Sequence, residues 1–294
     1  MKKISVVMPV YGQWSLAKRN IDSLIHFDSD LISEIIVVDD CSPEVNPFSF
    51  DETMVKVIRN PTNLGYTGTV NSGLKIASSE IILLLDSDAY LIMPIVGAII
   101  KMYDKDVELG CVGYRTVDDK GSETGSFCYE PTALGLILGQ KLEYKIEVLS
   151  IFKNRNILPY SCSVSFRKAC INEMLYFDEQ HFPVLDADLD LSMRIHRSKW
   201  KLLFNKNIIV SHSGGNSYKI NYKRVLLYYK SRWVLLRKHK LVKYPILTKC
   251  LIKMRLKLEL YILTIYGLFK HKDKLLMEKK NGRKLIVNEV LLYK

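Results

Sequence analysis

The sequence lacks the apolar runs that place a protein in a membrane or a secretory pathway. Its longest charge-free apolar run near the C-terminus, residues 260–269, has ten residues, whereas a membrane-spanning helix needs about 20. The apolar stretch from Ile4 to Val10, which follows Lys2 and Lys3, is also short and contains Pro9. It does not have the length of a signal-peptide core. We therefore expect neither a spanning helix nor a signal peptide.

Cysteine pairs of the metal-binding kind are also missing. The chain has six cysteines, and no two are separated by two residues. This spacing indicates neither a zinc knuckle nor a disulfide framework. We expect buried thiols in a reducing compartment, which is typical of a cytoplasmic protein.

Charge is distributed unevenly along the chain. Hydrophobic residues make up 48% of the sequence, enough for a substantial core, and the net charge is +12. Residues 219–294 carry 21 Lys and Arg against four acids, a balance of +17, so residues 1–218 carry −5. This change predicts two domains, 1–218 and 219–294. No nucleic-acid-binding module is recognisable in the basic part, so we do not expect a nucleic-acid partner.

Residues 81–88 form the most informative stretch. Five apolar residues, typical of a strand buried on both faces, lead directly into Asp86-Ser87-Asp88. Residues i and i+2 of a continuing strand point the same way, so Asp86 and Asp88 can converge on one ligand. Paired carboxylates suit Mg²⁺ or Mn²⁺, and these cations suit a diphosphate. The alternative is an acidic turn after a core strand.

The order of apolar and polar segments predicts the fold class. Strands at 4–10, 35–38, 54–58 and 81–85 alternate with helical patterns, which favours an α/β fold with a mostly parallel sheet flanked by helices. Asp39-Asp40 ends the second of these strands. In a parallel sheet it shares an edge with Asp86 and Asp88. Asp40 is therefore either a turn or helix-capping residue, or a contact for a ribose or base.

Two later segments carry further candidate groups. Asp186, Asp188 and Asp190 lie at the start of a helical pattern. They either complement the helix dipole or supply a general base. His212 follows another apolar strand, and a lone histidine in this position is more often structural than a ligand.

The C-terminal segment is helical by composition and amphipathic. Leu226, Tyr229, Trp233 and Leu236 share one face of the predicted helix, while basic residues occupy another. This pattern indicates binding to an anionic membrane surface. The alternative is a solvated basic face on a helix packed against the first domain. The amphipathic helices can also bind one another, which leaves the oligomeric state open.

Together these segments resemble family 2 glycosyltransferases, which have the GT-A fold. The resemblance covers about residues 3–218, in the family's order and spacing. The segments that carry it are Ser5–Tyr11, Glu34–Ser42, Asn63-Leu64-Gly65-Tyr66 with Asn71-Ser72-Gly73, Asp86-Ser87-Asp88, Phe177-Asp178-Glu179 with Asp188–Arg194, and Val210-Ser211-His212.

The resemblance implies a role for each matching residue. It implies a Mn²⁺ or Mg²⁺ ion held by Asp88, and Asp188 as the catalytic base. Asp86 would contact the ribose or the metal, and His212 would be a further ligand of the metal or of the diphosphate. The family usually has Glu-Asp where this chain has Ala187-Asp188, so Asp186 is the alternative base. The residues that would bind the nucleotide-sugar are Pro9, Val10, Tyr11, Asp40, Asn63, Gly65, Asn71, Asp86 and Ser87.

The resemblance also implies the reaction and the setting. It implies an inverting transfer of a sugar from a nucleotide-diphosphate donor to a hydroxyl. The basic C-terminal segment is reminiscent of bacterial members that build surface polysaccharide or O-antigen. These use glycan or lipid-diphosphate-linked acceptors at the cytoplasmic face of the plasma membrane, where the enzyme is peripheral.

Two other functions remain open from the sequence. A sugar-phosphate nucleotidyltransferase shares a similar core, but it carries a Gly-rich, Arg-containing loop after its first strand, where this chain has Pro9–Trp14. A decayed nucleotide-sugar-binding or membrane-scaffold protein is the non-enzymatic alternative. Retention of Asp86, Asp88, Asp188 and His212 together disfavours decay.

Overall fold

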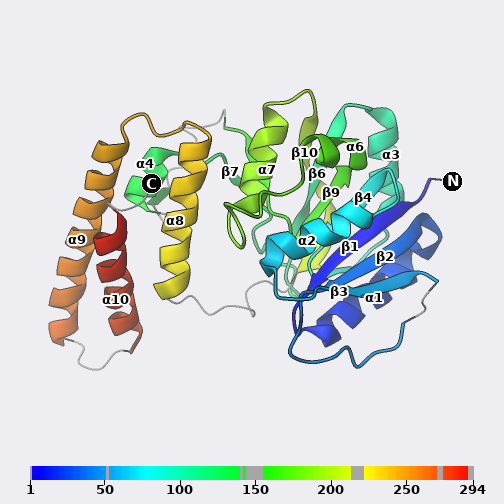
Figure 1. Cartoon of the computed structure of the whole chain (residues 1–294), viewed down its shortest axis with the longest axis horizontal. Helices are drawn as coiled ribbons and strands as arrows, with labels where there is room; N and C mark the ends of the chain where they lie inside the picture. Colours follow the sequence, from blue (N-terminus) through cyan, green and yellow to red (C-terminus); the bar gives the residue numbers. More distant parts are fainter. Residues whose placement is uncertain are drawn as a thin grey trace. The chain divides into compact units, whose positions relative to one another are not determined.

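Apolar residues that alternate across two buried faces build the central sheet of this protein. The computed structural model describes residues 2–50, 53–139, 142–143, 155–212, 222–269 and 274–290. It divides into two compact units (Figure 1). The first is formed by Met1–Tyr129 with Asn156–Gly214, and the second by Glu130–Arg155 with Gly215–Lys294. The second unit thus includes a segment that precedes residue 218, where the change of charge lies.

The first unit contains an eight-stranded sheet in the order β3-β2-β1-β4-β9-β6-β10-β5. β3, β2, β1 and β4 are parallel to one another, and β6 is parallel to β10, while β9 and β5 run antiparallel to their neighbours. This mixed, mostly parallel sheet confirms the predicted α/β class. Its strands are β1 (Ile4–Val10), β2 (Ile32–Asp39), β3 (Val55–Arg59), β4 (Ile81–Leu85), β5 (Ala89–Leu91), β6 (Leu109–Val117), β9 (Ser163–Arg167) and β10 (Lys201–His212). A separate pair consists of β7 (Phe127–Tyr129) and β8 (Ile157–Pro159).

Helices cover both faces of this sheet. Ile4, Val6, Met8 and Val10 alternate along β1 and join a core with residues of α1 and α3. On the opposite face α2 packs so closely on β1 that a Cβ at Gly73 would lie 2.5 Å from Val7. The helices of this unit are α1 (Trp14–Asp28), α2 (Gly65–Ile76), α3 (Val96–Lys105), α6 (Lys168–Glu173) and α7 (Ala187–His196), with a short 3-10 turn at Ser29–Leu31.

Helix α2 begins four residues earlier than the sequence predicts. The sequence alone predicts a loop over residues 63–68 and a helix over residues 69–78, whereas α2 begins at Gly65. The physical reason is a remote cap. The carboxylate of Asp40 accepts hydrogen bonds from the N–H groups of Leu64 and Gly65 at 2.7 and 3.0 Å.

The second unit is helical and has its own core. Tyr229, Trp233 and Leu236 are 5%, 1% and 0% exposed and pack in that core, together with Ile252 and Leu256. The face of α8 that we interpreted as a membrane-binding face therefore packs inside its own unit, and that interpretation is wrong for these residues. The helices are α4 (Ala133–Leu138), α8 (Tyr222–Lys238), α9 (Pro245–Phe269) and α10 (Lys274–Glu289).

Two expectations for this part of the chain have further outcomes. The sequence also predicts a helix over residues 134–151. α4 covers the beginning of this range, and residues 140–141 and 144–151 lie outside the described residues. In the described ranges, no helix combines the length and the apolar character needed to cross a bilayer.

Candidate active site

The two aspartates after β4 lie in a turn and not on a continuing strand. β4 ends at Leu85, and the N–H of Ala89 donates to the carbonyl of Asp86 at 3.0 Å, which closes the turn. The prediction that Asp86 and Asp88 point the same way along a continuing strand is therefore wrong. The turn nevertheless brings the two carboxylates together, because the chain reverses there into β5.

The pairing of β10 with β5 brings His212 close to these aspartates. β10 and β5 run antiparallel with His212 opposite Ala89, one residue after Asp88. Nε2 of His212 lies 3.2 Å from Oδ1 of Asp88. Ligand atoms of Asp86, Asp88 and His212 all lie within 4.8 Å of one another. The three residues that the resemblance assigns to a metal are thus gathered at one edge of the sheet.

The electrostatics of this cluster fit a cation. Burial, and next the charge of Asp88, raise the pKa of Asp86 to about 6. For His212, burial lowers the pKa, but the hydrogen bond and charge of Asp88 outweigh it, so the pKa is raised. Nδ1 of His212 is buried and has no hydrogen-bond partner within the described residues. Two partly buried carboxylates and an imidazole form a donor set suited to a divalent ion such as Mn²⁺.

Two polar residues that were not predicted from the sequence connect this cluster to Asp188. The hydroxyl of Tyr66 donates to Oδ1 of Asp86 at 2.9 Å and lies 2.9 Å from Oγ of Ser161. The backbone N–H of Ser161 donates to Oδ2 of Asp188 at 3.3 Å. Tyr66 belongs to the Asn63–Tyr66 segment that resembles the family, but no pattern in the sequence indicates its hydrogen bonds to Asp86 and Ser161.

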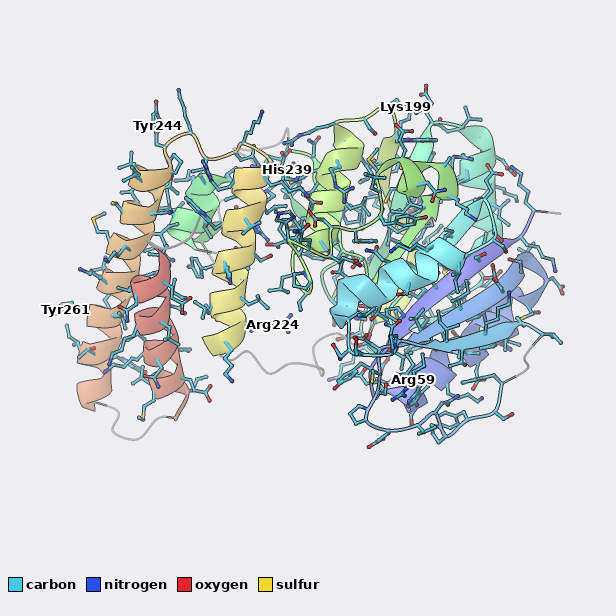
Figure 2. The ribbon with its side chains drawn as sticks, in the orientation of Figure 1. Arg59, Lys199, Arg224, His239, Tyr244 and Tyr261 are labelled. Atoms are coloured by element: carbon cyan, nitrogen blue, oxygen red, sulfur yellow. The ribbon has the colours of Figure 1, made fainter. Side chains whose placement is uncertain are left out.

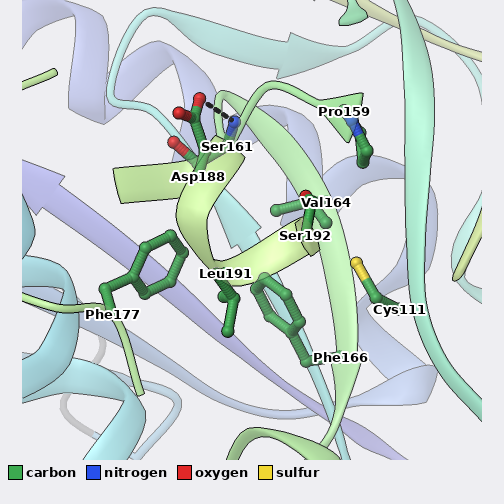
Figure 3. Close-up of a pocket in the computed structure, with 9 residues that line it drawn as sticks. All are labelled: Cys111, Pro159, Ser161, Val164, Phe166, Phe177, Asp188, Leu191 and Ser192. Atoms are coloured by element: carbon green, nitrogen blue, oxygen red, sulfur yellow. Dashed lines mark hydrogen bonds between the residues drawn. The ribbon is translucent and has the colours of Figure 1, made fainter. Parts of the chain in front are cut away.

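Asp188 lies in the first turn of α7, at a narrow pocket (Figure 3). Figure 3 shows its carboxylate beside Ser161, with Phe166, Phe177 and Leu191 forming an apolar side of the same pocket. Burial, and next the charge of Asp186, raise the pKa of Asp188 to about 6. A carboxylate with a raised pKa near neutrality suits proton transfer.

The other two acids of this segment have different surroundings. Asp186 is 8% exposed and precedes the helix with a left-handed φ of 64°. Asp190 is fully buried and forms an ion pair with Arg194 at 2.9 Å. Asp188 is therefore the acid of the three that lines the pocket.

The loops after β1 and β2 lie at the same carboxyl-end edge of the sheet as the turn after β4, because these strands are parallel. The N–H of Asp40 donates to the carbonyl of Val10 at 2.9 Å, and the N–H of Gly12 donates to Oγ of Ser42 at 2.8 Å. Pro9 and Val10 are buried in β1, whereas Tyr11 is 51% exposed. Hydrogen bonds thus join the loop after β1 to the loop after β2, and the ring of Tyr11 in the first of these loops is exposed.

The remaining predicted donor-binding residues take part in local structure. Oδ1 of Asn63 accepts from the N–H of Gly65 at 3.1 Å. Asn71 is 3% exposed and exchanges two hydrogen bonds with the backbone of Phe177, at 2.9 and 3.1 Å. Asn71 thus ties α2 to the segment that leads to Asp188. Ser87 lies half-buried in the turn between Asp86 and Asp88.

A family model and a curated relative match the chain in sequence. The model of glycosyl transferase family 2 matches residues 5–172, more than half of the chain. Poly(ribitol-phosphate) beta-glucosyltransferase from Bacillus spizizenii is 38% identical over 96 residues. That match covers 30% of this chain and 15% of the relative, so the similarity spans a small part of the relative's length.

Solved structures with a similar fold are glycosyltransferases. Mannosyltransferase PcManGT from Pyrobaculum calidifontis, solved with GDP-Man and Mn²⁺, has a TM-score of 0.61 and 12% identity, over 99% of this chain and 86% of that one. TarS 1-349 from S. aureus, solved with UDP-GlcNAc, has a TM-score of 0.52 and 16% identity, over 98% and 81%. At these identities the likeness establishes the fold, which is GT-A.

Proposed function

This chain belongs to glycosyl transferase family 2, and on that premise we propose that it is a metal-dependent inverting glycosyltransferase. It moves a sugar from a nucleotide-diphosphate donor to a hydroxyl of a glycan or lipid-diphosphate-linked acceptor. The observation that carries the proposal is the gathering of Asp86, Asp88 and His212 within 4.8 Å, joined through Tyr66 and Ser161 to Asp188. In this proposal a donor-binding group after β4 and a base at the start of α7 are connected by hydrogen bonds.

The donor would occupy the edge formed by the β1, β2 and β4 ends. Tyr11 offers an exposed ring on which a base can stack. The carboxylate of Asp40 accepts two hydrogen bonds on Oδ1 and one on Oδ2, from Asn60 and the start of α2. It would therefore shape the nucleoside site and keep one lone pair, on Oδ2, for a ribose. Asn71 would act indirectly, through the segment it holds.

Asp86, Asp88 and His212 would hold the cation, which when bound neutralises charge on the leaving diphosphate. The imidazole favours Mn²⁺ over Mg²⁺, because Mg²⁺ prefers an all-oxygen shell. The similar PcManGT was solved with Mn²⁺. After burial, the charge of Asp88 is the next cause of the raised pKa of Asp86. Two carboxylates that repel each other in this way would be stabilised by a bound cation.

Asp188 would act as the general base. It takes the proton of the acceptor hydroxyl while that oxygen attacks the anomeric carbon, and the bond from that carbon to the diphosphate oxygen breaks. One displacement inverts the anomeric configuration and needs no second carboxylate for a covalent intermediate. A positioned base of this kind contributes about 10²–10⁴-fold. Asp186 would act by its charge on the pKa of Asp188.

We assign the acceptor to cell-surface polysaccharide assembly. The support is the similarity to a poly(ribitol-phosphate) beta-glucosyltransferase and the strongly basic residues 219–294. A lipid-linked acceptor would be met by a peripheral enzyme at the cytoplasmic face of the bacterial plasma membrane. The basic helices suit this location because the cytoplasmic leaflet carries anionic lipid.

The test is transfer from a panel of UDP-, GDP-, dTDP- and CMP-sugars to lipid-linked and soluble glycan acceptors, with the product's anomeric configuration read by NMR. We expect one donor to give an inverted product. Asp188→Asn should reduce the rate by at least about 10²-fold and leave donor affinity nearly unchanged. Asp22→Asn, an exposed acid of α1 paired with Lys18, is the matched control. Retention of configuration, or full activity of Asp188→Asn, would contradict the proposal.

A further inference from the structure

Helix α9 carries a row of apolar side chains that nothing in the described structure covers. Its buried side includes Ile252 and Leu256, both 0% exposed, which pack in the core of the second unit. Figure 2 shows Tyr261 on the side of α9 that faces away from α8 and α10. The uncovered residues, which we call the α9 stripe, are Leu247, Met254, Leu258, Tyr261, Ile262 and Ile265, between 41% and 66% exposed.

Helical geometry shows that the α9 stripe is one continuous face. At about 100° per residue, its six members fall within an arc of about 100° that is centred opposite Leu256. No charged residue of α9 falls inside this arc. A helix that packs on one side needs no second apolar face for folding. The exposed apolar surface of the α9 stripe therefore indicates an interaction site.

The charges beside the α9 stripe are basic. Lys257 lies about 40° beyond one end of this arc and Lys253 about 80° beyond it. Neither lysine forms an ion pair within the described ranges. The single acid of α9, Glu259, is held by two arginines, Arg255 and Arg283. The uncovered face is therefore apolar in its centre and positive at its border.

We propose that the α9 stripe is a membrane-docking face that inserts into the headgroup region of an anionic bilayer. The helix lies along the surface with the six apolar residues in the interface and Lys253 and Lys257 at the lipid phosphates. Tyr261 suits this depth, because aromatic residues with a polar end favour the membrane–water interface. The inference refines the proposed function, since it assigns the membrane contact to particular residues of α9 in place of α8.

The charges beside the α9 stripe favour a lipid surface over a second copy of the chain as its partner. Two copies joined through the α9 stripe with antiparallel helices, related by a two-fold axis, would place the basic border of each helix beside that of the other. Like charges would then repel, and Glu259, the one acid of α9, is already paired with Arg255 and Arg283. An anionic lipid surface satisfies the apolar centre and the positive border together.

The experiment is flotation of the full chain with phosphatidylcholine vesicles, with and without phosphatidylglycerol, in the absence of donor and acceptor. The test variant is Met254→Gln with Leu258→Gln, at positions 64% and 59% exposed, which removes apolar area without changing charge. Thr264→Gln, exposed on the same helix outside the arc, is the matched control. Lys253→Gln with Lys257→Gln tests the charged border.

We expect the native chain to float with the anionic vesicles and the double apolar variant to bind at least about tenfold more weakly. Thr264→Gln should bind as the native chain does, and the lysine variant should lose the preference for anionic lipid. Equal binding of the native chain and the double apolar variant would overturn the proposal. So would self-association of the native chain without lipid that the double variant abolishes, since the α9 stripe would then be an interface between copies.

This readout is independent of the catalytic assignment. A chain that floats but transfers no sugar would refute the proposed reaction and leave the membrane face intact. A chain that transfers sugar to a soluble acceptor but does not float would refute the membrane face alone.

Discussion

At the scale of single residues, Tyr66 is the contact that joins the two ends of the candidate site. Its hydroxyl binds Asp86 and lies beside Ser161, whose N–H binds Asp188. Burial raises the pKa of Tyr66 well above its ordinary value, so the phenol keeps its proton and can donate to Asp86. Under the proposed function, Tyr66 would thus be a positioning residue for the cation ligand Asp86 directly and for the base Asp188 through Ser161.

Replacing Tyr66 by Phe should remove this contact and keep the ring. We expect kcat/KM to fall about tenfold, since a hydrogen bond to a charged group is lost, and the thermal stabilisation by Mn²⁺ to decrease. Steady-state kinetics and thermal melts with and without Mn²⁺ are the measurements. A variant with native kinetics and a native response to Mn²⁺ would show that the contact does not position Asp86.

The raised pKa of Asp188 predicts the acid limb of the pH profile. Burial and the charge of Asp186 raise this pKa to about 6, and a base loses activity as it is protonated. We therefore expect kcat/KM to fall as the pH decreases through about 6. Asp186→Asn removes the neighbouring charge and should shift this limb to lower pH. An acid limb that Asp186→Asn leaves in place would mean that another group titrates.

At the scale of elements, Glu34 of β2 fastens the sheet to the end of α2. Oε1 accepts from Oγ of Ser5 and the N–H of Ser78, both at 2.8 Å, and Oε2 forms an ion pair with Lys56 at 2.8 Å. Burial by itself raises the pKa of Glu34, but Lys56 and the serines outweigh it and lower the pKa to about 2. The anion is therefore favoured in the folded state.

This lowered pKa predicts how stability depends on pH. The folded-state pKa lies below the ordinary value of 4.5, so the contribution of Glu34 is complete above that value and is lost as the pH falls toward 2. Glu34→Gln should cost about 1–3 kcal/mol at neutral pH and flatten the loss of stability between those two pH values. Denaturant melts across this range test it, and an unchanged pH slope in the variant would contradict it.

The elements that could be predicted from the sequence are those whose pattern lies within the element itself. β1 and β4 were predicted because their apolar runs are buried on both faces. The start of α2 was not, because its cap, Asp40, is 24 residues away from Leu64. Ser161 was missed for the same reason: it lies 95 residues beyond Tyr66, and one hydrogen bond leaves no pattern in a sequence. Strand register places His212 beside Asp88 and is equally invisible from composition.

At the scale of the whole molecule, the basic charge and the uncovered apolar surface of α9 lie in the same unit. The change of charge near residue 218 follows from composition. The sequence does not show which apolar face of each helix is buried. Trp233 and Leu258 both belong to apolar patterns, but in the packed unit Trp233 is 1% exposed and Leu258 is 59% exposed. The first unit carries the candidate active site, and the second carries the proposed membrane contact.

This division predicts how lipid affects turnover. Transfer to a lipid-linked acceptor in anionic vesicles should slow as salt rises, because screening weakens the attraction to the membrane. Transfer to a soluble glycan acceptor should not show this dependence. Initial rates with the two acceptors over a salt series make the comparison, and equal salt dependence would place the effect in the active site.

The most direct test of the central claim, a metal-dependent nucleotide-sugar site at Asp86, Asp88 and His212, is a thermal-shift panel. UDP-, GDP-, dTDP- and CMP-sugars are each measured with Mn²⁺, Mg²⁺ or EDTA, on the native chain, Asp88→Asn, His212→Gln and the control Asp22→Asn. A ligand that binds the folded state alone raises the melting temperature. We predict a rise with one nucleotide class that requires the cation, persists in Asp22→Asn and is lost in Asp88→Asn and His212→Gln. A rise of equal size in EDTA and in Asp88→Asn, or no rise with any donor and cation, would contradict the account.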